Sequence, residues 1–255
     1  MLSAALVNRS LADWTFRLGY SQGYRSPSLQ ELYTTSTNSK GGGTINPNPD
    51  LDPETAQSIE FGARYTKSGF DVDATVFYSR SEDYITWLPQ GSSYQFQNVE
   101  ESRSFGLELA ASYQYDFSER TALTPYLVGT WMRKCYEDDA STSYNTGIPR
   151  VQGRFGLRGN WDMAPEAHAW FDLFGRAADN ARDDGPEPPE GYETTSGWAT
   201  LNLELGYGWH QAVGSGLDWR VSVGIENLFD RDYMVAGEWI SAPGRSLFVK
   251  LGCTF

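Results

Sequence analysis

The sequence contains no long hydrophobic run and has a deficit of basic charge. No stretch of about 18 apolar residues occurs in its 255 residues, so it encodes no membrane-spanning helix. A spanning β-barrel stays possible, because its strands alternate apolar and polar residues and never produce such a run. Lys and Arg number 20 against 33 Asp and Glu, a formal net charge of -13. This balance argues against nucleic acid as a partner, since phosphate binding needs a basic face.

Cysteine and histidine are also scarce. Cys135 and Cys253 supply neither a metal-ligand spacing nor a disulfide framework. Neither His168 nor His210 lies near a candidate nucleophile, so serine-triad chemistry is not indicated. We therefore predict no catalytic residue, no metal site and no cofactor. The opening residues 1–11 carry a brief apolar patch but lack the basic and hydrophobic regions of a signal peptide.

The sequence does have a regular alternation of apolar and polar residues. It is clear in "SIEFGARY" (58–65), "FDVDATVFY" (70–78) and "FGLELAASYQY" (105–115). A period of two is typical of a β-strand with one apolar and one polar face, and no segment predicts a helix. The strand around Pro125 is equally apolar on both sides, so its inward face is not predicted. We predict about ten strands, at residues 11–21, 56–66, 70–86, 94–115, 120–134, 149–161, 166–178, 196–210, 217–228 and 244–255.

The connections between these strands alternate between short and long. If the strands run up and down, all short turns lie at one end of the sheet and all long loops, around 22–55, 87–93, 135–148, 179–195 and 229–243, lie at the other. Aromatic residues gather at the short-turn ends, where rings would lie at a membrane–water interface. These are Trp14, Tyr65, Phe70, Tyr113, Tyr115, Trp161, Trp209, Trp219 and Phe255. The pattern predicts an all-β fold, an antiparallel up-and-down transmembrane β-barrel.

Four stretches resemble one known family, the TonB-dependent receptors of Gram-negative outer membranes. "GYRSPSLQELY" (23–33) and "NPDLDPETAQSIEFGARY" (48–65) are similar to segments of its barrel, as is "NVEESRSFGLEL" (98–109). "GIENLFDRDYMVAGEWISAPGRSLFVKLGCTF" (224–255) resembles its closing segment. The four stretches occur in the family's order and cover almost the whole chain.

The resemblance implies a barrel of 22 strands filled by an N-terminal plug that contacts TonB. Residues 1–255 would then be the C-terminal portion of such a receptor, with the plug domain and the N-terminal strands absent and Met1 an internal or artificial start. The implied function is uptake of a scarce nutrient across the bacterial outer membrane, with a ferric siderophore as the commonest substrate and cobalamin or haem as alternatives. Outer-membrane lipid and lipopolysaccharide would surround the barrel, and Phe255 would be the signal read by the barrel-assembly machinery.

Candidate functional residues fall into two groups. Charged side chains on the polar faces would line the lumen and hold the plug, in preference to contacting substrate. They are Arg17, Glu60, Arg64, Glu108, Arg154, Arg158, Glu204 and Arg220. Aromatic side chains on or near the long loops would bind a flat chelate, corrin or haem, although packing is the commoner role for any one of them. They are Trp87, Tyr94, Phe96, Tyr136, Tyr144, Tyr192, Tyr233 and Trp239.

Two alternatives from other classes are a ten-stranded outer-membrane barrel enzyme and a soluble β-sandwich binding module. The enzyme would need histidine at the extracellular rim, whereas His168 and His210 are expected near the opposite end. The sandwich would place aromatic residues in mid-strand. The acidic loop at 179–193 is expected to be solvated surface, or a site for divalent cations that bridge lipopolysaccharide or help bind a cobalamin.

Overall fold

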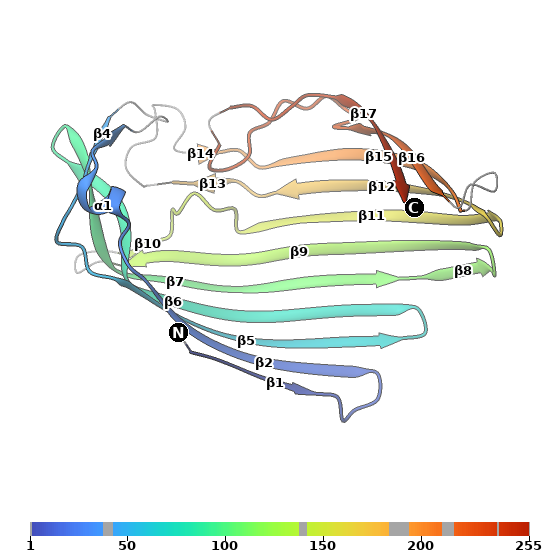
Figure 1. Cartoon of the computed structure of the whole chain (residues 1–255), viewed down its shortest axis with the longest axis horizontal. Coiled ribbons are helices and arrows are strands. Elements are labelled where there is room, and N and C mark those ends of the chain that lie inside the picture. Colours follow the sequence, from blue (N-terminus) through green and yellow to red (C-terminus); the bar gives the residue numbers. More distant parts are fainter. Residues whose placement is uncertain are drawn as a thin grey trace.

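A single large antiparallel sheet forms most of the computed structural model, which describes residues 2–37, 43–137, 142–183, 194–210, 217–238 and 240–254 (Figure 1). Each main strand pairs with the next one along the chain, so the predicted up-and-down order is confirmed. In order across the sheet the main strands are β1 (Leu2–Asn8), β2 (Trp14–Arg25), β5 (Glu54–Lys67), β6 (Phe70–Gln90), β7 (Ser93–Tyr113), β9 (Thr121–Glu137), β11 (Val151–Ala164), β12 (Ala167–Ala178), β15 (Trp198–Trp209), β16 (Asp218–Glu226) and β17 (Ser246–Thr254).

Short elements complete the fold. They are α1 (Leu29–Tyr33), β3 (Ser36–Thr37), β4 (Thr44–Asn46), β8 (Tyr115–Ser118), β10 (Thr142–Ser143), β13 (Ala181–Arg182) and β14 (Thr194–Thr195). All ten predicted strands are present, but β1 is additional, because its sequence "LSAALVN" lacks the polar alternation that marks the others. The expectation of no helix is also wrong. The helix α1 has a single turn, too short for periodicity, and forms on a capping box between Ser28 and Glu31.

The apolar residues of successive strands lie side by side on one face of the sheet, here called the apolar face. One row crosses from β2 to β9 and consists of Leu18, Phe61, Val76, Leu107 and Trp131. A second row crosses from β11 to β17 and consists of Leu157, Leu173, Leu203, Ile225 and Leu247. These rows remain open to the surroundings, with Phe61 47% and Leu247 79% exposed. An apolar surface of this extent on one face is a surface for lipid or for a partner.

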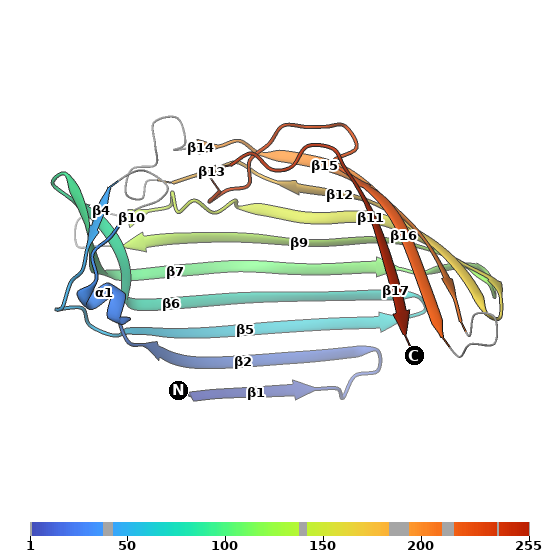
Figure 2. The ribbon, with the colours of Figure 1, turned by 45° about the horizontal axis from the view of Figure 1, so that its top comes forward.

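A second sheet does not cover this face. Within the described ranges the other sheet is the two-stranded pair β13–β14. A β-sandwich needs two sheets packed face to face over a shared core, so the soluble sandwich alternative is not supported. The strands β1 and β17 stand at the two ends of the strand order (Figure 2). No helix in the described part of the chain is long and apolar enough to cross a membrane.

Aromatic side chains mark the short-turn edge of an apolar band. At the short-turn end, Trp14 packs on Tyr65 and Phe70 on Tyr113, with ring centroids 5.0 and 4.3 Å apart. On β6 the apolar positions run from Phe70 to Tyr78, roughly 26 Å at about 3.3 Å per residue. This span agrees with the roughly 9–11 residues that a tilted transmembrane strand needs to cross a bilayer. The predicted girdle at the short-turn end is confirmed for the described residues, whereas Phe255 lies outside them.

The β6–β7 hairpin continues well beyond the band at the long-loop end. Its strands stop at Gln90 and resume at Ser93, so the predicted loop at 87–93 is mostly strand. The hairpin tip lies beside α1 and β4 (Figures 1 and 2), and β4 pairs in parallel with β7 through Ile45 and Tyr94. Apolar side chains from the loop and the hairpin form a small buried core here. Its members are Ile45, Leu51, Ile85 and Val99.

Candidate functional site

The long loop after β2 is anchored at its base by one arginine. The Arg25 guanidinium donates to Glu31 at 2.9 Å and to Glu54 at 2.7 Å. A Glu54 carboxylate oxygen also accepts the backbone N–H of Ile85 at 2.6 Å. The segments 23–33 and 48–65, which carried the family resemblance, therefore meet in space and tie the loop to the β6–β7 hairpin.

Asn98 fixes the bend of that hairpin. Its side-chain oxygen accepts the N–H of Asp52 at 2.9 Å, and its amide group donates to the carbonyls of Asp52 and Asp83 at 3.0 and 2.6 Å. Asp83 has a φ of 55°, a left-handed conformation that interrupts the regular alternation of β6. Tyr84 follows directly and packs on Tyr136 of β9.

Tyr84, Lys134 and Tyr136 form what we call the mouth cluster, at the long-loop end of the polar face. The two rings stack with centroids 5.7 Å apart. The Lys134 ammonium lies 5.0 Å from the Tyr84 centroid and 4.8 Å from the Tyr136 centroid. Burial raises the pKa of both phenols, so both stay neutral at physiological pH. The cluster thus presents one cation beside two stacked, neutral aromatic rings, beyond the apolar band.

Only one predicted aromatic candidate, Tyr136, belongs to this cluster. Trp87 and Tyr94 meet edge to face at 5.1 Å near the hairpin tip, and Phe96 lies opposite Trp87 on β7. The ring of Tyr144 lies 4.1 Å from the guanidinium carbon of Arg133. Tyr233 packs on Trp198, with ring centroids 4.5 Å apart. The remaining two candidates, Tyr192 and Trp239, lie outside the described residues. The eight candidates therefore do not converge on one site.

Tyr84 and Lys134 were missed in the sequence because each lies within an expected strand and not in a loop. The signal that could have found them is the length of those strands. Residues 70–90 are too many for a single crossing of roughly ten residues, so the distal part must project beyond the membrane.

The predicted polar-face residues do share one face, and most are paired there. Arg17 makes two hydrogen bonds to Asp73, at 2.6 and 3.0 Å, and Arg64 donates to Asp71 at 2.6 Å. Glu204 accepts from the Ser222 hydroxyl at 2.7 Å and from Lys250 at 3.3 Å. The remaining two carboxylates of the set are Glu60, which lies against Gly19, and Glu108, which is exposed.

Asp172 is the centre of the densest polar contact and was not among the predicted residues. It is 5% exposed and accepts from Arg154 at 2.8 Å, from Arg158 at 3.3 Å and from the Tyr126 hydroxyl at 2.8 Å. Arg154 also lies 3.7 Å from the Phe174 ring centroid. The hydrogen bond between Tyr126 and Asp172 shows that Tyr126 lies on the polar face, so it identifies the inward face of β9 that the sequence left open.

The short-turn end holds both histidines. His210 lies 2.7 Å from Asp218, and His168 and Arg220 line a hollow of about 450 Å³ beside them. Neither histidine is near the mouth cluster, as predicted, so a histidine-based site at the long-loop rim has no support. In the part of the chain that the structure describes, no group of three or more His, Cys, Asp or Glu side chains is placed to hold a metal ion.

Comparison with known proteins identifies the family. Residues 4–228 match the family model described as "TonB dependent receptor-like, beta-barrel". The chain is 24% identical to the vitamin B12 transporter BtuB of Vibrio vulnificus over 91% of its own length and 34% of that protein. It is 25% identical to the heme/hemopexin utilization protein C of Haemophilus influenzae over 99% of its length and 37% of that protein. The chain therefore spans about a third of the length of these relatives.

Solved structures agree with the fold. The copper transporter OprC superposes with a TM-score of 0.70 at 22% identity, over 98% of this chain and 38% of that one. The siderophore receptor PirA of Acinetobacter baumannii superposes with a TM-score of 0.66 at 15% identity, over 98% and 40%. In outer-membrane β-barrels, the class of the matching family model, the long loops are extracellular and the apolar face meets lipid, so the two ends and faces of this sheet are assigned accordingly. The chain belongs to the TonB-dependent receptor-like β-barrel family, whose members are outer-membrane receptors and transporters and not enzymes.

Proposed function

We propose that this chain is the C-terminal portion of a 22-stranded receptor barrel that takes up a ferric siderophore. In this proposal the remaining strands close the barrel, a plug domain fills it, and TonB acts on the plug. Charged side chains of the polar face hold the plug, and the barrel-assembly machinery reads Phe255. The extracellular loops capture the substrate before the plug moves.

The observation that carries the substrate class is the mouth cluster. A flat aromatic chelate can stack on the rings of Tyr84 and Tyr136, and the Lys134 cation attracts the negative charge that ferric siderophores commonly carry. The cluster lies on the polar face at the extracellular end, where a ligand would first enter the barrel. No covalent chemistry is required of these residues.

Cobalamin or haem is the second candidate, because the relatives that match almost the whole chain are named for vitamin B12 and heme. Either ligand would use the two rings but depend less on the lysine charge. The acidic segment 179–193 favours this candidate if it holds divalent cations. Most of that segment lies outside the described residues.

The test is direct binding of a ferric tricatecholate, cyanocobalamin and haem, each alone, to the full-length receptor. Binding is monitored by the quenching of the receptor's intrinsic fluorescence. We expect the ferric tricatecholate to bind and Lys134→Gln to weaken it roughly fivefold. A matched control is Lys67→Gln, whose ammonium pairs with Asp13 at the opposite end of the strands. Binding of cobalamin or haem alone would replace the siderophore by the second candidate, and binding of none of the three would refute both.

A further inference from the structure

The loop that links β16 to β17 is held by the side chain of Asn227, which is 3% exposed. The backbone N–H of Asn227 donates to the side-chain oxygen of Asn202 on β15 at 2.9 Å. Its own side-chain oxygen accepts the N–H of Arg231 at 2.9 Å, and its amide group donates to the carbonyls of Arg231 and Pro243 at 2.8 and 3.4 Å. One residue therefore joins the wall, the start of the loop and the end of the loop.

Asp230 makes a second connection between the two ends of this loop. Its carboxylate accepts the backbone N–H of Arg245 at 2.7 Å, and Arg245 directly precedes Ser246, the first residue of β17. The N–H of Asp230 donates to the carbonyl of Asn227 at 2.8 Å, and both residues have a φ of 53°, in the left-handed region. Since Ser246 pairs with Glu226, the last residue of β16, these contacts adjoin the first pair between the two strands. We call Asn227 and Asp230 the loop clamp.

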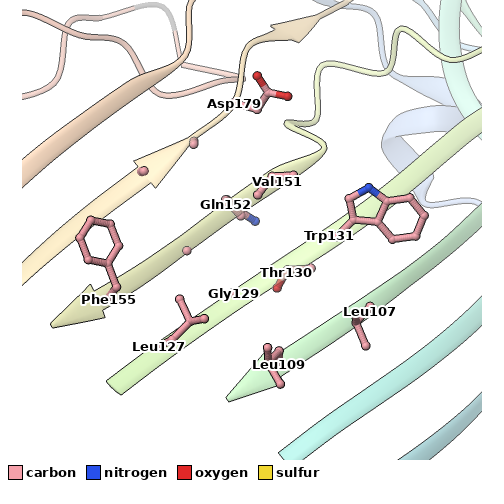
Figure 3. A pocket seen from close by; sticks show the side chains of 13 residues that line it. Leu107, Leu109, Leu127, Gly129, Thr130, Trp131, Val151, Gln152, Phe155 and Asp179 are labelled. Carbon is pink, nitrogen blue, oxygen red and sulfur yellow. The ribbon is translucent and has the colours of Figure 1, made fainter. Parts of the chain in front are cut away.

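The alternation of apolar and polar residues does not by itself set the register of β17. A shift by one residue would move its apolar side chains to the polar face, whereas a shift by two keeps them on the lipid face. The lipid face repeats similar side chains at every second position, as where Leu107 and Leu109 of β7 line the same apolar hollow (Figure 3). On β16 and β17 the repeated side chains are Val221, Val223 and Ile225, which pair with Leu251, Val249 and Leu247.

One contact within the strands agrees with the observed register. The Phe248 ring lies over Gly224, where any side chain would collide with it. A slip of two residues would set Phe248 opposite Ser222 or Glu226, which do not leave that space. A two-residue hairpin turn would add its own fixed geometry, but residues 227–245 form a much longer connection. The register therefore also depends on how the two ends of this loop are held.

We propose that the loop clamp selects the register in which β17 pairs with β16. Asn227 and Asp230 are thus positioning residues, which act on the strand through the ends of the loop. Because β17 stands at one end of the strand order, its register decides which backbone groups it presents to a further strand. A slip of two residues would displace this edge by roughly 6.6 Å. In the full-length receptor of our proposal the edge meets the strand that closes the barrel, whereas the clamp itself does not depend on substrate or plug.

The test is cysteine cross-linking of the full-length receptor refolded into lipid vesicles, with Cys253→Ser in every sample. V223C combined with V249C reports the observed register, because Val223 and Val249 are direct partners and both are exposed. V223C combined with L247C or with L251C reports a slip of two residues in either direction. In the observed register the Cα atoms of such diagonal pairs are about 7–8 Å apart, too far for a disulfide.

Asn227→Gly and Asp230→Gly remove the two clamping side chains and keep the left-handed backbone accessible. We expect each substitution to raise the diagonal cross-links at least fivefold relative to the direct cross-link. Arg231→Ala is the matched control in the same loop. It removes the hydrogen bond from the guanidinium to the Gly197 carbonyl at 3.3 Å, which does not involve β17, and should leave the cross-links unchanged.

Unchanged cross-links in both glycine variants would overturn the proposal. So would loss of the direct cross-link without any diagonal product, including a failure to refold, because the clamp would then stabilise the hairpin without selecting its register. Diagonal products in Arg231→Ala as strong as those in the glycine variants would also overturn it, since any loosening of the loop would then shift the strand.

Discussion

At the scale of single residues, the polar face is stabilised by carboxylates held between cations. Asp172 is the clearest case, because two guanidinium groups and a phenol donate to this carboxylate, which is only 5% exposed. A group of this kind matters most when one partner is removed. The donors then lose a charged acceptor, although water replaces part of that interaction because the side chains of Arg154 and Arg158 are 43% and 50% exposed.

Replacing Asp172 with Asn should therefore destabilise the barrel by about 1 kcal/mol, since solvent screens the two half-exposed guanidinium groups. The amide keeps the shape of the side chain but loses the charge that Arg154 and Arg158 share. The unfolding free energy of the full-length receptor in urea and lipid measures the effect. Glu108→Gln is the matched control on the same face and should change stability by less than about 0.5 kcal/mol, because Glu108 is exposed. Equal effects of the two substitutions would contradict the role assigned to Asp172.

The ion pairs of Glu101 can be tested through the pH dependence of the protein's stability. Hydrogen bonds from Arg103 and Arg80, beyond the membrane band, lower the pKa of Glu101 to about 2. Because the folded pKa lies below the ordinary value, this carboxylate stabilises the fold fully above about pH 4.5, and the stabilisation is lost as the pH falls toward 2. The thermal midpoint of Glu101→Gln should lie below that of the wild type by a constant amount above pH 5, and the difference should narrow toward pH 2. A difference in thermal midpoint that stays the same from pH 5 to pH 2 would contradict the stabilising role of these ion pairs.

At the scale of elements, the segments that resemble the family have a structural role. They fold the loop after β2 onto the β6–β7 hairpin through Arg25, Asn98 and a small apolar core. Leu51 of the Asn-Pro-x-Leu segment is 8% exposed within that core. The hairpin projects beyond the sheet, so this core is its main lateral support.

Leu51→Ala should loosen the hairpin tip without unfolding the sheet. The cavity left behind costs about 2 kcal/mol locally. Hydrogen–deuterium exchange should rise in β4 and near Tyr94, whereas β7 within the membrane band stays protected. Leu29→Ala makes the same chemical change at a side chain that is 75% exposed and should leave exchange unaltered. Loss of protection throughout β7 after Leu51→Ala would show instead that the loop core supports the whole sheet.

The sequence predicted the strands and their faces because lipid and lumen impose a strict period of two. It did not predict β1, whose residues are nearly all small or apolar, or the tip of the β6–β7 hairpin at 87–93, which it assigned to a loop. Of the three residues of the mouth cluster, only Tyr136 was predicted. Lys134 comes beside Tyr84 through the bend at Asp83, and no local pattern in the sequence encodes a contact between strands that are not neighbours along the chain.

At the scale of the whole molecule, the sheet has two terminal strands. In the described structure β1 pairs on one side with β2, and β17 pairs on one side with β16. An unpaired edge exposes backbone N–H and C=O groups, and in a hydrocarbon environment each costs several kcal/mol. The edges of this chain therefore need partner strands, which our proposal assigns to the rest of a full-length receptor.

The 255-residue chain refolded alone in detergent should accordingly form dimers or larger species, whereas the full-length receptor should be monomeric. Light scattering coupled to size-exclusion chromatography measures both masses in one detergent. Exposed apolar rows such as Leu247, Val249 and Leu251 should also make the isolated chain aggregate when detergent is withdrawn. A monodisperse monomer of the chain in detergent would contradict the edge argument, because both terminal strands would then be stable unpaired. A soluble monomer without detergent would contradict the lipid-facing assignment itself, since no described element covers the apolar face.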